Sequence, residues 1–191
     1  MELREMKQIF NIPFAQEMVL SAREKSRKLG SINNSILGGG GNTAGYLGEE
    51  AVAEYMNADI ISCEEGRSKY NHDLILNGQR IEIKTKRRTV KPLPHYEVSV
   101  AQTSKHQVPD LYIFLSLEFD RVEGRGRNKI YYGLKNVWVC GQMEPDRYFE
   151  RAHLWEAGRV DVSNNFKTHV NMYNLSIESL DFLKYSGSNS R

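Results

Sequence analysis

The chain has 191 residues, of which 40% are hydrophobic and 26% are charged, as is typical of a soluble globular domain that can bury a core. Its formal net charge of +2 is too small to indicate a polyanionic partner by itself. No apolar run approaches the roughly 18 residues of a membrane span, and the first residues lack the apolar core of a secretion signal, so we expect a cytoplasmic protein with no membrane partner. The two cysteines form no CxxC motif, so we expect no disulfide framework and no structural zinc site.

The first quarter of the chain predicts two helices separated by a loop. Apolar spacing predicts helices over residues 14–29 and 46–57, and the glycine- and asparagine-rich residues 31–45 predict a loop between them. In the second helix, Glu49 falls in line with the apolar stripe, whereas Glu50 falls on the polar side. A carboxylate on the core-facing side is unfavourable to bury unless something pairs with it, so Glu49 is a candidate functional residue.

The stretch HDLILNGQRIEIK, residues 72–84, predicts a β-hairpin turned at Asn77-Gly78, because Asn-Gly favours a type I′ turn with positive φ at both residues. A two-residue loop fixes the register and places Asp73 opposite Glu82, with Cβ atoms about 5 Å apart. At an effective dielectric of about 20, two such carboxylates repel by roughly 3 kcal/mol. A bound divalent cation with hard oxygen ligands would compensate that repulsion.

The same pair has an alternative explanation, a surface salt-bridge ladder, because Arg80, Glu82, Lys84 and Lys86 share one face of the second strand and Arg80 and Lys84 are the diagonal neighbours of Asp73. Two observations favour the metal site. Ile75 shares the face of Asp73 by the two-residue period of a strand, so that face is not simply solvated. Glu49 fits a metal site and has no role in such a ladder.

The rest of the chain predicts an alternation of strands and helices. Residues 110–119 are apolar on both faces, as in a central strand that is covered on both sides. The other predicted elements are a strand at 59–65, a basic, proline-broken loop at 87–95, a short extended piece that passes into a helix within 96–107 with Ser99 as the N-cap, a hairpin with its tip at 123–129, a helix at 146–157, an extended segment at 160–175 and a short helix at 177–183.

Gly48-Glu49 on the second helix, Asp73 on the hairpin and Glu82-Ile83-Lys84 on its second strand together resemble the motif of the PD-(D/E)xK nuclease superfamily, in its small phage and bacterial form. The resemblance covers residues 45–119, and His72 stands where the motif name has proline. It implies an α/β, restriction-endonuclease-like core, in which helices flank a central mixed β-sheet in the order αβββαβ, and a location in a bacterial or phage-infected cell. The expected organisation is an N-terminal helix and glycine-rich loop (1–45), a nuclease core (46–120), a C-terminal elaboration of the same domain (121–185) and a disordered tail (186–191).

The resemblance also implies the chemistry, a Mg²⁺-dependent endonuclease that hydrolyses phosphodiester bonds in DNA, with Mn²⁺ as a substitute. Asp73, Glu82 and the backbone carbonyl of Ile83 would hold the ion. Glu49 would bind it through water or hold a second ion. Lys84 would orient and deprotonate the attacking water, or stabilise negative charge on the phosphate.

Clusters of basic residues near this motif suit a polyanionic substrate, although solvated loops of no special use remain an equal alternative for each cluster alone. Double-stranded DNA is the expected substrate, and double-strand cutting favours a homodimer. The other functions left open are a catalytically inactive nucleic-acid-binding or assembly module and an RNA-directed nuclease. The residues expected to contact nucleic acid are Lys86, Arg87, Arg88, Lys91, Gln102, Lys105, Arg125 and Arg127.

Overall fold

The structure, a computed structural model, describes residues 9–29, 40–60, 72–107, 109–124, 129–161 and 166–184. Its three α-helices and two 3₁₀ turns are α1 (Gln16–Leu29), α2 (Gly40–Met56), α3 (Pro145–Arg151), η3 (Gln102–Ser104) and η5 (Ile177–Ser179). Its strands are β1 (Phe10–Ile12), β2 (Asp59–Ile60), β3 (Leu74–Leu76), β4 (Gln79–Arg88), β5 (Glu97–Ala101), β6 (Leu111–Glu123), β7 (Ile130–Met143), β8 (His153–Trp155), β9 (Val160–Asp161), β10 (Phe166–Lys167) and β11 (Met172–Ser176). None of the described helices is long and apolar enough to cross a membrane.

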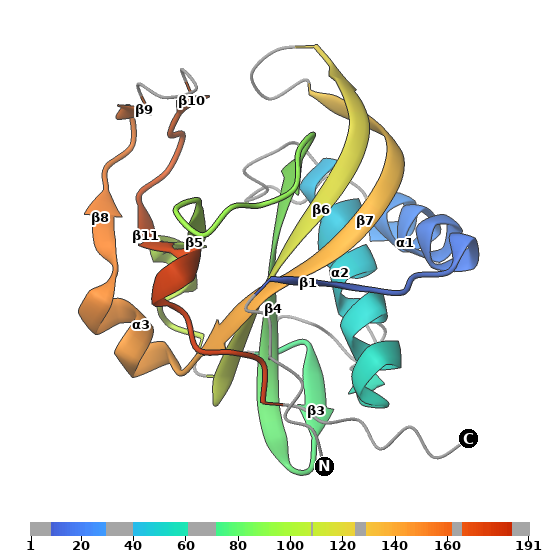
Figure 1. The fold of residues 1–191 in the computed structure, drawn as a ribbon, viewed down its shortest axis with the longest axis horizontal. Coiled ribbons are helices and arrows are strands. Elements are labelled where there is room, and N and C mark those ends of the chain that lie inside the picture. The colour runs from blue at the N-terminus through green and yellow to red at the C-terminus, as the bar shows by residue number, and fades with distance from the viewer. Residues whose placement is uncertain are drawn as a thin grey trace.

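The central sheet has six strands in the order β1-β7-β6-β4-β3-β2. Strands β4 and β6 are parallel, and the other neighbours in this sheet are antiparallel. A second sheet has the order β5-β11-β8, and β9 pairs with β10. The fold is therefore α/β with a mixed central sheet, as the sequence predicts (Figure 1).

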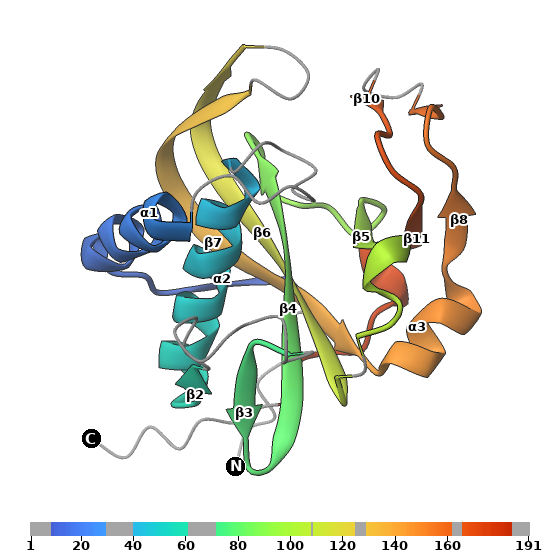
Figure 2. The same cartoon turned by 180° about the vertical axis from the view of Figure 1, so that it is seen from behind.

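The two faces of the central sheet are covered by different elements. Helices α1 and α2 lie on one side, whereas α3 and the three-stranded sheet lie on the other (Figures 1 and 2). Alternation along β4 and β6 sends Ile83 and Leu115 into the first core, with residues of α2, and sends Tyr112 and Phe114 into the second, with Tyr148 of α3. Each face is thus buried against its own layer of secondary structure.

Two predicted elements at the start of the chain are confirmed in kind, but with different bounds. Helix α1 matches the predicted helix at 14–29. Helix α2 begins at Gly40, so the prediction of a loop is wrong for 40–45, and residues 31–39 lie outside the described part of the chain. Ala44 in this added turn is 6% exposed and belongs to the core. Tertiary burial therefore stabilises a turn whose glycines alone disfavour a helix.

The predicted helix within 96–107 is wrong. The segment forms strand β5 followed by the 3₁₀ turn η3, with Val98 and Val100 buried and their neighbours half-buried in the two-residue period of a strand. Its pairing partner is β11, where Leu175 lies opposite Val98. Because that partner is far away in sequence, local helix propensity is overridden.

The later predictions are confirmed in part. The central strand expected at 110–119 is β6, buried from Leu111 to Leu117, and it forms the expected hairpin with β7. The helix expected at 146–157 ends at Arg151 and is followed by β8, and the helix expected at 177–183 is only the turn η5. Only Asp59–Ile60 of the predicted strand at 59–65 lies within the described residues, and the predicted tail at 186–191 lies outside them.

Candidate functional site

The hairpin that carries the predicted acidic pair forms around Asn77 and Gly78, whose φ angles are 51° and 78°. Positive φ at both positions is the geometry of a type I′ turn, which asparagine and glycine adopt readily. The ladder pairs Leu76 with Gln79, Ile75 with Arg80 and Leu74 with Ile81. The predicted register is confirmed up to the last of these pairs.

Beyond that pair, the ladder departs from the regular register at Asp73. The Asp73 amide donates a hydrogen bond of 2.8 Å to the carbonyl of Ile81, which is also the ladder partner of Leu74. The regular ladder thus ends at Leu74, and the Asp73 amide bonds to the residue that pairs with Leu74. The expected direct pairing of Asp73 with Glu82 is not part of this ladder.

The Asp73 carboxylate instead reaches the backbone of β4. Its Oδ2 accepts a hydrogen bond of 2.8 Å from the amide of Ile83. Because Ile83 lies between Glu82 and Lys84 in the chain, this bond fixes the carboxylate beside the Glu-Ile-Lys segment. In a strand, the N–H and C=O groups of one residue point to the same side, so the Ile83 carbonyl is also directed toward Asp73.

Glu82 and Lys84 share one face of β4 and pair with each other. Lys84 Nζ lies 2.7 Å from Glu82 Oε1, and their side chains are 17% and 7% exposed. The same ammonium donates a bond of 3.3 Å to Gln107 Oε1. A half-buried lysine is thus held between a carboxylate and an amide oxygen.

Tyr112 of β6 is the neighbour of this ion pair in the sheet. It lies opposite Glu82 in the parallel ladder, and its ring centroid is 5.8 Å from Lys84 Nζ. Burial, and to a smaller extent the charge of Glu82, raise the pKa of its phenol. Its buried hydroxyl has no hydrogen-bond partner within the described residues. Tyr112 therefore presents a neutral aromatic ring to the ion pair and adds no charge.

Gly48 brings α2 into direct contact with β4. A Cβ at this glycine would lie 2.3 Å from Thr85 Oγ1 and 3.1 Å from Leu115 Cδ1, so no larger residue fits without displacement. The neighbouring Glu49 is 5% exposed. Helix α2 faces the Ile83 side of β4, and Glu82 and Lys84 alternate to the opposite side.

The structure does not bring Glu49 into a shared cluster with the other two acids. Among the residues that it describes, no three His, Cys, Asp or Glu side chains come close enough together to hold a metal ion. What the structure does bring together is Asp73, the backbone of Ile83, Glu82 and Lys84. Mg²⁺ in proteins is often held by only one or two carboxylates, with water and phosphate completing its shell.

The two cations of the alternative salt-bridge ladder form other pairs. Arg80 binds Asp110 through two bonds of 2.7 and 3.1 Å, and its amide donates a third of 2.8 Å. These bonds lower the pKa of Asp110 to about 2. Lys84 pairs with Glu82, as described above. Arg80 is thus directed to Asp110, whereas the Lys84–Glu82 pair is a contact that the salt-bridge alternative also contains.

The predicted nucleic-acid-binding residues are mostly held by contacts within the protein. Lys86 and Arg88 both donate bonds of 2.9 Å to the carbonyl of Glu97. The remaining contacts place Arg87 over Tyr131, Lys91 over Trp138 and Lys105 over Phe149 and Tyr173, and bond Gln102 to Asn171. Arg125 and Arg127 lie outside the described residues.

Two further residues contribute to the site without having been predicted from the sequence, Gln107 and Tyr112. Gln107 lies in the segment that we expected to be a helix, where Gln102 and Lys105 seemed the better candidates. Tyr112 lies in an apolar run and gives no sequence signal other than its place opposite Glu82, which only the parallel pairing of β4 and β6 creates.

Comparison with protein-family models and with characterised proteins gives no match to this chain. The resemblance to the PD-(D/E)xK superfamily therefore stays a prediction from the motif. The arrangement of Asp73, Glu82 and Lys84 is the basis for the function proposed below.

Proposed function

We propose that the chain is a Mg²⁺-dependent endonuclease that hydrolyses phosphodiester bonds in DNA. The observation that carries the proposal is the hydrogen bond of 2.8 Å between the Asp73 carboxylate and the Ile83 amide, next to the Glu82–Lys84 pair at 2.7 Å. This geometry gathers two carboxylates and a lysine at one end of a hairpin. The order α2, β2, β3, β4 and β6 agrees with the core order that the motif implies, although β5 and η3 stand where that order has a helix.

The donors at this end of the hairpin suit a hard divalent cation. Asp73, Glu82 and the Ile83 carbonyl would hold Mg²⁺ or Mn²⁺ through oxygen alone, with water and a substrate phosphate as further ligands. When bound, the ion would polarise the phosphate and lower the pKa of a coordinated water. Glu49 is proposed only as a contributor through water, because it approaches from the α2 layer.

Lys84 would act on the phosphate or on the attacking water. Its ammonium is held by Glu82 and Gln107 and keeps one further N–H donor. An ammonium at this point would stabilise the negative charge that develops on a phosphate during hydrolysis. Glu82 thus has two proposed partners, the ion and Lys84.

The proposal is tested by incubating the purified protein with closed circular DNA, linear duplex DNA and RNA, each with Mg²⁺ and with EDTA. We expect nicking or linearisation of the circle with Mg²⁺ only, and loss of that activity in Lys84→Met. Cleavage of RNA alone would support the RNA-directed alternative, and DNA binding without cleavage would support the inactive module. Cleavage that persists in EDTA would contradict the proposed chemistry.

A further inference from the structure

Strand β7 carries three aromatic rings that each hold a cation from a different segment. Arg121 of β6 lies 4.7 Å from the Tyr132 ring, Arg87 of β4 lies 4.6 Å from the Tyr131 ring, and Lys91 of the following loop lies 4.7 Å from the Trp138 ring. We call these six residues the β7 cation row. In each contact the ring face attracts the cation electrostatically.

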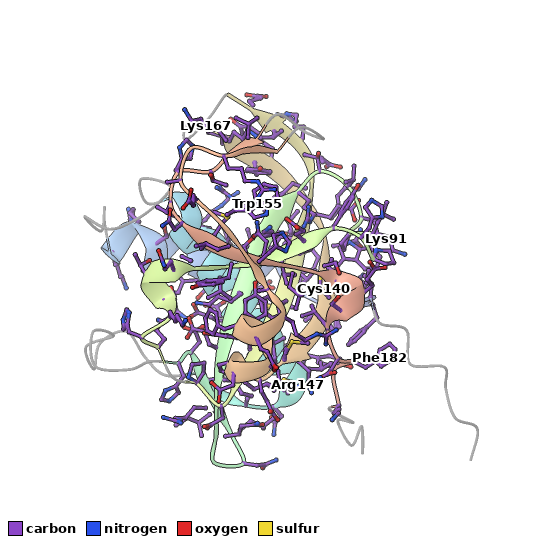
Figure 3. All side chains as sticks on the ribbon, turned by 90° about the vertical axis from the view of Figure 1, so that its left-hand side faces the viewer. Lys91, Cys140, Arg147, Trp155, Lys167 and Phe182 are labelled. Atoms are coloured by element: carbon purple, nitrogen blue, oxygen red, sulfur yellow. The ribbon has the colours of Figure 1, made fainter. Side chains whose placement is uncertain are left out.

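Two of these rings are held in place by other side chains, and the rings in turn position their cations. Trp138 Nε1 donates a bond of 2.7 Å to Glu118, and the Tyr131 ring packs against Phe119 at 5.3 Å. Lys91 and Arg121 remain exposed, and Lys91 lies at the margin of the molecule in Figure 3. An arginine that stacks through its face keeps its N–H edge available for an anion. Within the described residues, Glu123 is the carboxylate that engages Arg121, through Nε.

Part of the row lies on a projecting β-ribbon. The pairing of β4 with β6 ends at Arg88–Glu118, while β6 and β7 continue together to Glu123–Ile130. A register shift after Glu118 accompanies the bend of this ribbon away from the sheet (Figures 1 and 2). Arg121 and Tyr132 lie on the projecting part, and Lys91 and Trp138 lie near its base.

We propose that the β7 cation row binds the phosphate backbone of double-stranded DNA, at a distance from the hairpin that carries Asp73. Tyr132 pairs with Arg121 and Trp138 pairs with Ser116 across a register shift, so Arg121 and Lys91 lie on opposite faces of β7, six positions and about 20 Å apart along the strand. The major groove of DNA, about 12 Å wide, admits a two-stranded β-ribbon, so cations on the two faces of the ribbon can contact phosphates on both edges of a groove. This inference rests on the proposed function, since it names how the substrate of that site is held.

The arrangement of rings and cations in the β7 cation row favours binding of duplex phosphates over stacking of single-stranded bases. Single-strand binders use open aromatic faces on which bases stack. Here each of the three rings is covered on one face by a cation, and all three are half-buried. Of the three cations, Lys91 and Arg121 are exposed, and such charged groups contact phosphates without reading sequence.

The test is fluorescence anisotropy with a labelled duplex and the matching single strand, in EDTA so that no cleavage occurs, over a range of salt concentrations. We expect Lys91→Ala/Arg121→Ala to weaken duplex binding by about 10-fold and to reduce the slope of log K against log salt by about 2, as for two lost phosphate contacts. Arg23→Ala/Arg27→Ala, at two exposed arginines of α1, is the matched control because it also removes two positive charges, and it should change neither quantity. Tyr132→Leu should weaken binding and Tyr132→Phe should not, because only the ring positions Arg121.

An unchanged affinity and salt slope in the double variant would overturn the inference, as would tighter binding of the single strand than of the duplex. If the proposed nuclease function is wrong, the expected result is different, namely normal duplex binding without Mg²⁺-dependent cleavage. If instead cleavage of the wild-type protein is confirmed and the double variant binds normally, only the inference about the β7 cation row is wrong.

Discussion

The two faces of β4 differ more than any other pair of neighbouring surfaces described above. The face toward α2 carries Ile81 and Ile83, which are buried in an apolar core, and contacts the helix at Gly48. The opposite face carries a row of charged residues, Glu82, Lys84, Lys86 and Arg88, which are buried or half-buried.

The charged face is stabilised by specific partners and not by solvent alone. Lys84 pairs with Glu82, and Lys86 and Arg88 share the carbonyl of Glu97. Burial lowers the pKa of Arg88, as desolvation of a cation does. Removing charges from water is unfavourable and gains little stability even when they are paired. One face of β4 therefore packs in the apolar core, and the other carries the groups on which the proposed function depends.

The largest expected effect is on Asp73→Asn, which removes a charge from the hairpin and keeps an oxygen for the Ile83 amide. Loss of a metal-binding carboxylate should reduce cleavage by about 1000-fold, since metal stabilisation of the transition state is worth several kcal/mol. Circular dichroism and the Tm should stay close to those of the wild type. Cleavage within a few-fold of the wild type would show that the charged face is not the active one.

The second prediction compares two lysine–glutamate pairs. Lys84–Glu82 and Lys25–Glu50 have N···O distances of 2.7 and 2.6 Å, but only the first lies on the charged face. Glu82→Gln should lower the cleavage rate by about 100-fold or more. Glu50→Gln should cost about 1 kcal/mol or less in stability and leave the rate unchanged. Equal losses of activity in both variants would contradict the claim that only the Lys84–Glu82 pair takes part in cleavage.

The third prediction concerns the apolar face. Gly48→Ala forces a methyl group against Thr85 and should destabilise the protein by about 1–3 kcal/mol, which a Tm measurement would show as a fall of several degrees. Gly45→Ala is its control, because the nearest atom to a Cβ there is Glu49 Oε1 at 3.7 Å. That change should stabilise the helix by about 0.5–1 kcal/mol. Similar Tm shifts in the two variants would contradict the close packing of α2 on β4.

The smallest effect is expected from Asp110, whose pKa is lowered to about 2 by Arg80. A carboxyl with a lowered folded-state pKa stabilises the protein above its unfolded pKa of about 3.9, and loses that contribution as the pH falls toward the folded value. In Asp110→Asn, acid unfolding curves should therefore be shallower between about pH 4 and pH 2. The size of the effect is small because both side chains are well exposed.

The sequence could predict the parts of this account that depend on local rules. Asn77-Gly78 fixes the turn and its register, and alternation along β4 assigns Glu82 and Lys84 to one face. The placement of Asp73 could not be predicted fully, because the ladder ends at Leu74 and the carboxylate bonds to the Ile83 amide. Local rules give no signal for this side-chain contact.

Errors of prediction arose where distant segments decide the structure. Strand β5 needs β11 as its partner, and the helix predicted there hid the role of Gln107. Helix α2 extends back to Gly40 because Ala44 is buried in the core. The position of Glu49 relative to the other acids depends on which layer α2 joins, and helical spacing alone does not specify that layer.

Direct measurement of metal binding tests the central claim, that Asp73 and Glu82 hold one divalent cation beside Ile83. Mn²⁺ titration of the purified protein, followed by the electron paramagnetic resonance signal of the free ion, should show one site in the wild type. That site should be lost in both Asp73→Asn and Glu82→Gln and kept in Glu50→Gln. Undiminished Mn²⁺ affinity in the first two variants would contradict the account.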